Sequence, residues 1–475
     1  MAQAIWLRLC SSNKPVWRSE ASKLLRMRFA TLAAVLPALS QAAKYAVIAA
    51  GSSGYMNYRH QADACHAYQI MKKSGIPEEN IILMMQDDVA NAKENPFPGQ
   101  LFNKPGNDVE DVYAGCKVDY RGKIVTAKLF LSVITGDSSG VPANGKVLKS
   151  GPNDDVFLNF VDHGGVGIIA FPNGPVLHVK QLSSAIKTMQ ENSMFKQLLF
   201  YMEACESGSM FPHLQRRGKV LAVTAANAKE SSWGTYCSDA DKVKNKSLHT
   251  CLGDLFSISW MEDSDLGRLG SETIKTQIHR VTQRTNKSHV MTFGDRSFEN
   301  EPIGDFQHEW QGKPEQHKTS ESNSVDVRDL DVHRAYQVWS HAKTPEEKAK
   351  AWKALMQVVA DRTEDESIFK GFVAKACKGV NMYKCQERFE TEKADLEDLD
   401  CHAQLAQSVF EECPRREIHF SPGGWNGFNM QFSQVLANVC EGKHALGKSS
   451  DDLNEVIRSE CASARSRAQT AAVVV

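Results

Sequence analysis

Cys205 lies between two acidic residues, Glu203 and Glu206, where an apolar run ends in the stretch "LLFYMEACESGS", residues 198–209. Nearby carboxylates raise the pKa of a thiol, and a protonated thiol is a poor nucleophile. The thiol could therefore be a small buried hydrophobic group, one half of a disulfide, or a nucleophile. The choice depends on which groups other parts of the chain bring to it.

A histidine occupies the matching position on another apolar run. His163 precedes two glycines at the end of "DDVFLNFVDHGG", residues 154–165. If the two runs are adjacent strands, His163 can take the proton of Cys205 and leave a thiolate. The backbone N–H groups of Gly164 and Cys205 would then form an oxyanion hole. Each residue alone is more often structural, but the pair at matched strand ends favours acyl transfer.

Arg59, in "NYRHQADACHAYQ", also follows an apolar strand and always carries its charge. An acid opposite it, such as Asp254 in "CLGDLFS", would accept protons from an amide. Together the two match both ends of a carboxamide, and asparagine is the small side chain that both donates and accepts. A surface salt bridge is the alternative. Cys65 and His66 are adjacent, but they fall in a helical pattern and are interpreted as packing residues.

These residues follow elements of a mainly parallel α/β sheet. Continuous apolar strands that alternate with helices indicate a parallel sheet covered on both faces, with its ligand site beyond the carboxyl ends of the strands. The predicted strands are 44–51, 80–86, 154–165, 196–205 and 218–227, and the predicted helices are 60–75, 178–191 and 252–262.

The composition and the N-terminal segment indicate a globular protein of the secretory route. The 475 residues have a formal net charge of −1, 42% hydrophobic and 24% charged residues, so nothing points to nucleic acid as a partner. Met27 and Arg28 precede "FATLAAVLPALSQAA", which has the pattern of a secretory signal, so 1–43 is predicted to be a targeting segment. Either Met1 or Met27 is the start, and a disordered tail is the alternative. No other run is long enough to predict a membrane span.

In a secreted protein, the twelve cysteines are expected to form disulfides. The sequons at Asn245 and Asn286 are then predicted glycosylation sites. Residues 311–330 are polar and predict an exposed linker between a catalytic domain at 44–310 and an all-α, disulfide-bonded domain at 331–475.

The motifs together resemble the legumain family, the asparaginyl endopeptidases or vacuolar processing enzymes. The resemblance rests on "AGSSGYMNYRHQADACHAYQ", "GIPEENIILMMQDDVA", "NPFPGQLFN", "GKVLKSGPNDDVFLNFVDHGG", "FYMEACESGSMF", "TAANAKESSWGTYC" and "CLGDLFSISWMEDSD". These motifs cover most of 44–265, and the resemblance is weak from 325 to 461. "VDHGG" has glycine where many relatives have serine.

The resemblance implies a caspase-like domain with a mainly parallel six-stranded sheet, and a C-terminal death-domain-like prodomain. It implies a Cys205 nucleophile, a His163 general base oriented by Asn57, and the same oxyanion hole. It implies contact between Glu206 and the prodomain, and a succinimide at Asp162 linked to peptide ligation. The implied pocket for the P1 asparagine consists of Arg59, His60, Glu203, Ser231 and Asp254, with Ser232 beside it.

The resemblance also implies a set of disulfides. Cys237 and Cys251 bracket an insertion, as in plant-type members. The helical domain is expected to pair Cys401 with Cys440, and Cys413 with Cys461. Cys377 and Cys385 are additional and have no expected partner.

The expected activity is cleavage after asparagine, and after aspartate at acid pH, by a zymogen that activates itself at low pH. Asn323 is the expected self-cleavage point, with Asp326 and Asp329 as alternatives. Expected partners are protein and peptide substrates, the chain's own prodomain as inhibitor, and cystatin-type inhibitors, without metal or cofactor. The expected compartment is the vacuole or lysosome, or the exterior. Alternatives are a peptide ligase with the same residues, a transamidase that would need a membrane span, and a non-catalytic binding protein.

Overall fold

The computed structural model describes residues 42–307, 323–415 and 423–474. Nearly all of the expected targeting segment and most of the expected linker lie outside these ranges. None of the helices within them combines the length and the apolar character that crossing a bilayer requires.

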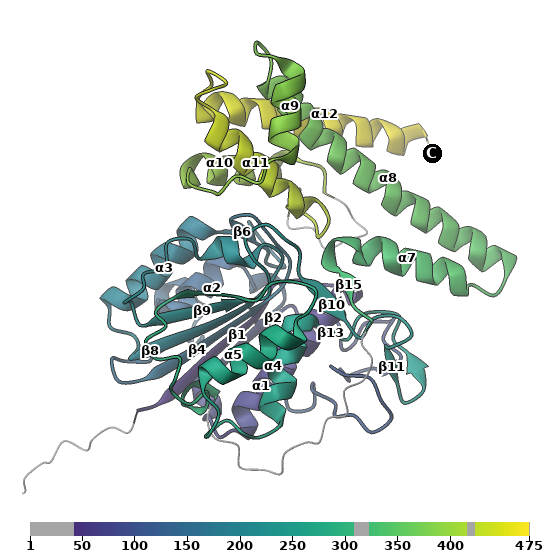
Figure 1. Ribbon diagram of the computed structural model, residues 1–475. Helices are drawn as coiled ribbons and strands as arrows, with labels where there is room; N and C mark the ends of the chain where they lie inside the picture. Colours follow the sequence, from purple (N-terminus) through teal and green to yellow (C-terminus); the bar gives the residue numbers. More distant parts are fainter. Residues whose placement is uncertain (1–41, 308–322, 416–422, 475) are drawn as a thin grey trace, which may run out of the picture. The chain divides into compact units, whose positions relative to one another are not determined.

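A seven-stranded sheet forms the centre of the N-terminal part, in the order β14-β9-β8-β4-β1-β2-β3 (Figure 1). Every pair is parallel except β14 with β9. The strands are β1 (Lys44–Ala50), β2 (Ile81–Met85), β3 (Tyr120–Arg121), β4 (Asp155–Val161), β8 (Gln197–Glu203), β9 (Val220–Thr224) and β14 (Met291–Gly294).

Two groups of helices cover the two faces of this sheet. Successive residues of a strand point to opposite faces, and in β1 Ile48 belongs to one apolar core and Val47 to the other. The first core includes α1 (Tyr58–Lys73), α4 (Leu255–Asp265) and α5 (Ile274–Arg284), and the second includes α2 (Ala127–Ile134) and α3 (Val179–Glu191). A short α6 (Gly304–Gln307) follows β14.

The sheet has one strand more than the six expected. The two strands without a predicted counterpart lie at its edges: β3 has only two residues, and β14 is partly exposed. Neither carries the continuous apolar run that identifies a buried parallel strand.

Short strands pair with one another near the ends of β4 and β8. β10 (Trp233–Thr235) pairs with β13 (Gly253–Asp254) on one side and with β15 (Val325–Asp326) on the other. The last residues of the expected linker are therefore packed: β15 is followed by a 3-10 helix at Val327–Asp329, in which Val327 and Arg328 are buried. The remaining short strands are β5 (Gly164–Gly165), β6 (Ile168–Ile169), β7 (Leu177–His178), β11 (Lys242–Val243) and β12 (Lys246–Ser247).

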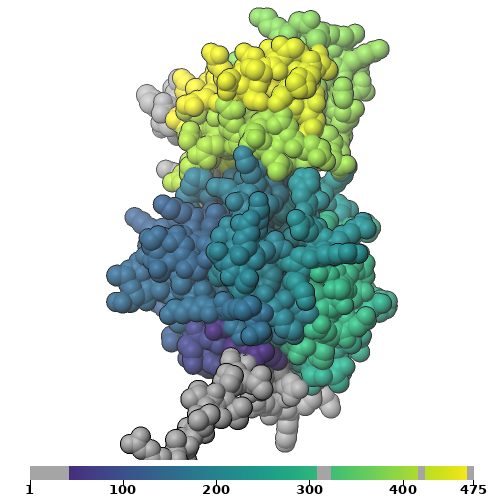
Figure 2. Space-filling model, turned by 90° about the vertical axis from the view of Figure 1, so that its left-hand side faces the viewer, coloured from purple at the N-terminus to yellow at the C-terminus, as the bar shows by residue number. Residues whose placement is uncertain are grey.

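The C-terminal part is helical. It comprises α7 (Leu330–His341), α8 (Pro345–Ala376), α9 (Met382–Thr391), α10 (Leu399–Glu412), α11 (Ser433–Gly442) and α12 (Ser450–Val474). Yellow α12 lies against green helices in Figure 2, and it packs on α8 and α10. Phe369, Trp425 and Leu436 are among the side chains of the core that these helices share.

Five disulfides join ten of the cysteines. Three have the expected pairing, Cys237–Cys251, Cys401–Cys440 and Cys413–Cys461, and the two additional pairs are Cys377–Cys385 and Cys65–Cys116. The interpretation of Cys65 as a packing residue was wrong. Its helical pattern is real, but its partner lies 51 residues later in a loop with no recognisable spacing.

Candidate active site

The register of β4 and β8 brings His163 and Cys205 to neighbouring positions. Val161 is paired with Glu203, and the Asp162 N–H donates to the Glu203 carbonyl at 3.0 Å. His163 and Cys205 each follow the paired residue by two positions. A Cβ on Gly164 would lie 2.5 Å from the Cys205 carbonyl oxygen, so only glycine allows these two loops to approach so closely.

Asn57 orients the imidazole of His163. The Asn57 Nδ2 group donates to the Ser53 carbonyl at 3.0 Å, which turns its Oδ1 toward His163 Nε2 at 2.8 Å. Nε2 therefore carries the proton, and Nδ1 is the basic nitrogen. Burial lowers the pKa of His163 well below its ordinary value, and the charges of Arg59 and Arg328 add to this effect. The imidazole is neutral in this state.

Cys205 is a protonated thiol in this structure. It is fully buried, and it is the one free cysteine among the described residues. Burial raises the pKa of Cys205 to about 12, against the opposing effect of the Arg328 charge. The Ser232 N–H donates to Sγ at 3.3 Å. A reactive thiolate therefore requires removal of whatever covers the thiol.

Arg59 and Asp254 form a buried ion pair rather than a surface one. Arg59 Nε donates to Asp254 Oδ1 at 2.8 Å, and both side chains are 1% exposed. Glu203 is also buried, and its Oε2 accepts from the N–H and the hydroxyl of Ser257 in the first turn of α4. A carboxylate is favourable there because the N–H groups at a helix N-terminus lack partners within the helix.

Three polar atoms of this buried group have no hydrogen-bond partner among the described residues. They are Arg59 Nη2, Asp254 Oδ2 and Glu203 Oε1. The charges of Arg59 and Asp254 both act on Glu203, so the three groups lie within electrostatic reach of one another. Buried polar atoms without partners are costly, and such a set indicates a ligand that supplies the missing hydrogen bonds.

His60 lies between this group and the sheet edge. Its Nδ1 is 2.6 Å from the Ser52 hydroxyl and 3.1 Å from Asp162 Oδ1, and its Nε2 is 3.4 Å from Asp254 Oδ2. Burial lowers the pKa of His60 and raises that of Asp162. His60, Asp162 and His163 hold possible metal-ligating atoms within 4.8 Å of one another. Ser52 and Asn57 already engage the two imidazoles, so we assign no metal to them.

The C-terminal part covers this site with an arginine and a glycine. Arg328 donates to the carbonyls of Gly164 and Gly427 at 2.6 and 2.7 Å, and to the Glu206 carboxylate at 2.6 Å. A Cβ on Gly427 would lie 2.8 Å from Cε1 of His163. A cavity of only about 40 Å³ remains beside His163.

A strand leads into the covered site. Val325 and Asp326 pair with β10, and the Val327 N–H donates to the Ser232 carbonyl at 3.1 Å. Val327 then packs in one apolar cluster with Cys205. The segment therefore lies along β10 at Val325 and Asp326, and the 3-10 helix that follows places Val327 in the apolar cluster of the thiol.

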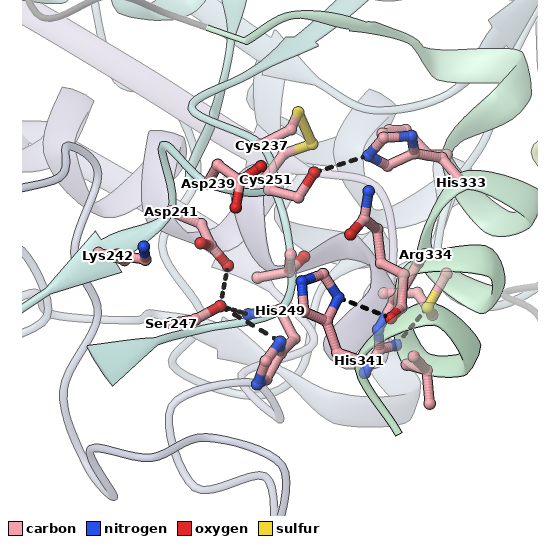
Figure 3. A pocket seen from close by; sticks show the side chains of 16 residues that line it. Cys237, Asp239, Asp241, Lys242, Ser247, His249, Cys251, His333, Arg334 and His341 are labelled. Carbon is pink, nitrogen blue, oxygen red and sulfur yellow. Dashed lines mark hydrogen bonds between the residues drawn. A yellow bond between two sulfur atoms is a disulfide. The ribbon is translucent and has the colours of Figure 1, made fainter. Parts of the chain in front are cut away.

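A larger cavity, about 190 Å³, lies between α7 and the loop closed by the Cys237–Cys251 disulfide (Figure 3). Ser238 of the loop and His333 of α7 both line it, with 3.0 Å between Oγ and Nε2. Helix α7 thus packs beside the segment that carries β10.

Other predicted residues lie at the surface. Ser231 is half-exposed in the loop before β10, and Asn323 is exposed, with its Nδ2 on the Ser238 carbonyl at 2.9 Å. Asn245, in the turn between β11 and β12, and Asn286 are both exposed. The structure adds residues that were not predicted: Ser52, Ser53, Ser257, Arg328 and Gly427. Ser52 and Ser53 contact His60 and Asn57 within the same short stretch of chain. Ser257, Arg328 and Gly427 act through contacts between distant segments, which leave no signal in local sequence.

Residues 44–309 match the model of the peptidase C13 family. The chain belongs to this family. It is a cysteine-type endopeptidase. The vacuolar-processing enzyme delta-isozyme of Arabidopsis thaliana is 37% identical over 417 residues, 84% of this chain and 86% of that protein. Legumain of Mus musculus is 50% identical over 265 residues, 55% of this chain and 59% of that protein. The structure of caspase-1 from Spodoptera frugiperda, at 10% identity and a TM-score of 0.32, covers 57% of this chain and 92% of that one, a likeness too weak for inference.

Proposed function

We propose that this peptidase cleaves peptide bonds after asparagine. The observation that carries the proposal is the set of buried atoms that lack a hydrogen bond among the described residues, one donor on Arg59 and two acceptors on Glu203 and Asp254. An asparagine side chain has the matching groups: its carbonyl accepts from Arg59 Nη2, and its NH₂ donates to the two carboxylates. A leucine of the same shape would leave all three atoms unpaired.

The reaction follows from the atoms around Cys205. The His163 Nδ1 atom takes the thiol proton, and Sγ attacks the carbonyl carbon that follows the asparagine. The Gly164 and Cys205 N–H groups stabilise the oxyanion. His163 then protonates the leaving amine, and water hydrolyses the thioester. Asn57 holds the Nε2–H group, so Nδ1 is the nitrogen that can accept the thiol proton.

Aspartate fits the same pocket only when a proton is added. An ionised aspartate would face two carboxylates, so one of the three acids must be protonated. Burial raises the pKa of Glu203 and of Asp254, so this group binds a proton at a higher pH than an exposed carboxylate does. We expect cleavage after aspartate to increase as the pH falls.

Site mapping tests the proposal. Acid-treated protein is incubated with a denatured carrier protein, and the new C-termini are identified by mass spectrometry. We expect most of them to be asparagine, with none from a Cys205→Ala variant. Cleavage without preference for asparagine, or equal cleavage by the alanine variant, would contradict the proposal.

We propose further that the C-terminal part is an intramolecular inhibitor. Arg328 and Gly427 cover His163 and the Gly164 loop, and Val327 packs on Cys205. Removal after Asn323, or after Asp326 or Asp329, would open the site to protein and peptide substrates and to cystatin-type inhibitors. The family and the exposed sequons at Asn245 and Asn286 support a glycosylated protein of the secretory route, in a vacuole, a lysosome or outside the cell.

A buried histidine pair supports release at acid pH. The His178 Nε2 atom lies 3.0 Å from His402 Nδ1, and the His402 Nε2–H group donates to the Ser433 carbonyl at 3.1 Å. His178 Nδ1 accepts from the Lys180 N–H. Each ring is therefore neutral and carries its proton on Nε2. Burial lowers the pKa of His178 to about 3 and that of His402 to about 4, and in His178 the neighbouring His402 and Lys180 act in the same direction.

The sign of the pH effect follows from these values. Released histidines bind protons near their ordinary pKa of about 6.5, so the released state takes up more protons and packing weakens as the pH falls from there toward 4. Glu206 acts in the opposite direction, because burial raises its pKa in the closed state to about 6. The two histidine shifts are larger than this one, so acid favours release.

A His402→Gln variant is expected to keep the C-terminal part packed at lower pH. Glutamine can accept from His178 and donate to Ser433 without gaining charge. In a Cys205→Ala background, which prevents self-cleavage, we expect its melting temperature to fall less than that of the parent between pH 6.5 and pH 4. A His444→Gln change, at an exposed histidine, is the control. Identical pH profiles of parent and His402 variant would contradict the proposed release mechanism.

A further inference from the structure

One face of α1 holds three polar residues that lie one helical turn apart. Arg59, Asp63 and His66 have spacings of four and three residues, so they point the same way. All three are buried against α4 and the segment before it. Arg59 belongs to the pocket already described, but Asp63 and His66 do not.

Asp63 holds the backbone of Asp254. Its Oδ2 accepts the Asp254 N–H at 3.0 Å, while Arg59 Nε binds the Asp254 side chain. Asp254 is therefore fixed at two points by the same helix face, and its Oδ2 has no hydrogen-bond partner among the described residues. A Cβ on Gly253 would lie 2.9 Å from Asp63 Oδ1, so the approach of Asp63 requires the glycine there.

Asn103 and His66 in turn hold Asp63. The Asn103 Nδ2 group donates to Asp63 Oδ1 at 2.6 Å and to the Leu252 carbonyl at 2.8 Å. Asn103 Oδ1 must therefore accept, and its partner is the Nδ1–H group of His66 at 2.8 Å. His66 Nε2 lies 3.0 Å from the Asp265 carboxylate. With both ring nitrogens donating, His66 is an imidazolium.

The two ends of this array carry groups of opposite charge type, the imidazolium of His66 and the carboxyl group of Asp63. Burial lowers the pKa of His66, but the Asp265 charge and the hydrogen bonds outweigh burial and raise it overall. Lys104 is the other cation that acts on His66. At the other end, burial and the charges of Asp254 and Glu203 raise the pKa of Asp63, and the hydrogen bonds from Asn103 and the Asp254 N–H oppose this rise. The Asn103 hydrogen bond, which His66 orients, thus favours the ionised form of Asp63 against the effect of burial.

We infer that Asp63, supported by Asn103 and His66, is a positioning residue that sets both the orientation and the proton affinity of Asp254 in the asparagine pocket. This inference rests on the proposed function, because Asp254 affects cleavage only if the pocket binds the P1 side chain of the substrate. Asp63 itself does not touch the substrate, since each of its oxygens already accepts an N–H. It acts through Asp254.

Two substitutions with opposite electrostatic signs test this inference. Asp63→Asn removes a negative charge beside Asp254 and places an NH₂ group against a donor. His66→Gln removes a positive charge but keeps a donor for Asn103. The matched control is Asp155→Asn, the same change at a buried aspartate of β4 outside the pocket.

The readouts are kcat and KM for a P1-asparagine peptide, and the pH below which a P1-aspartate peptide is cut. For Asp63→Asn we expect KM to rise about tenfold with little change in kcat. We expect the pH below which the aspartate peptide is cut to fall by about one unit. For His66→Gln we expect the pH below which the aspartate peptide is cut to rise by a similar amount. Thermal unfolding checks that each variant is folded.

Opposite shifts with an unchanged control support the inference, because loosened packing alone would move both variants in one direction. Shifts of the same sign, or none, overturn it while the asparagine preference of the unmodified enzyme still supports the proposed function. Absence of that preference in the unmodified enzyme overturns both.

Discussion

The Val327→Asn protein is expected to cut its own chain between residues 327 and 328, a bond that the unmodified protein leaves intact. The Val327 N–H binds the Ser232 carbonyl, and the Ser232 N–H binds the Cys205 thiol. Arg328 lies on the Gly164 carbonyl. The bond between residues 327 and 328 therefore lies beside the proposed nucleophile and oxyanion hole. Valine offers no carboxamide for the pocket, whereas asparagine would turn the inhibitory segment into a substrate.

Intact mass and N-terminal sequencing after incubation at acid pH measure this outcome. We expect a new chain that begins at residue 328 to be the first product of the variant. Val325→Asn is the matched control, because it introduces the same side chain two residues earlier on β15. Identical fragments from the Val327 variant and the unmodified protein would contradict the placement of residue 327 beside Cys205.

An Arg59→Leu variant is expected to lose at least about a thousandfold in kcat/KM for asparagine peptides. A site built to hydrogen-bond a substrate loses roughly 10⁴-fold when a pairing is missing, and here the change also leaves two buried carboxylates without their cation. The Glu203 and Asp254 carboxylates would then take up protons and no longer accept from the substrate NH₂ group.

Kinetics on acid-activated protein measure this loss, and Arg296→Leu, at an exposed arginine, is the control. A cysteine-reactive reagent without a P1 side chain shows whether Cys205 still reacts. Retained thiol reactivity with lost peptide cleavage is expected. A loss of less than tenfold would mean that Arg59 does not bind the substrate amide.

The sequence was enough to predict the strands that carry the site, because buried parallel strands are continuous apolar runs with reactive residues at their ends. His163 and Cys205 are brought together because β4 and β8 are in register. The Arg59–Asp254 pair was also predicted, although as one of two interpretations. The structure shows a buried ion pair, not a surface salt bridge.

Residues on helices and in turns could not be found in the same way. Asp63 and His66 are polar residues on a helix, a pattern typical of a solvated face, and only the packing of α4 buries them. Gly427 touches His163 across 264 positions of chain, and Arg328 reaches Gly164 across 164. Such contacts are set by tertiary packing, so they have no local periodicity.

The central claim is that Cys205 attacks bonds whose preceding side chain is a carboxamide held by Arg59, Glu203 and Asp254. The ratio of kcat/KM for two peptides that differ only in asparagine or leucine at P1 tests it most directly, because the two side chains have the same shape. We expect a ratio of at least about 10³ in favour of asparagine. A ratio within tenfold of unity on fully activated enzyme would contradict it.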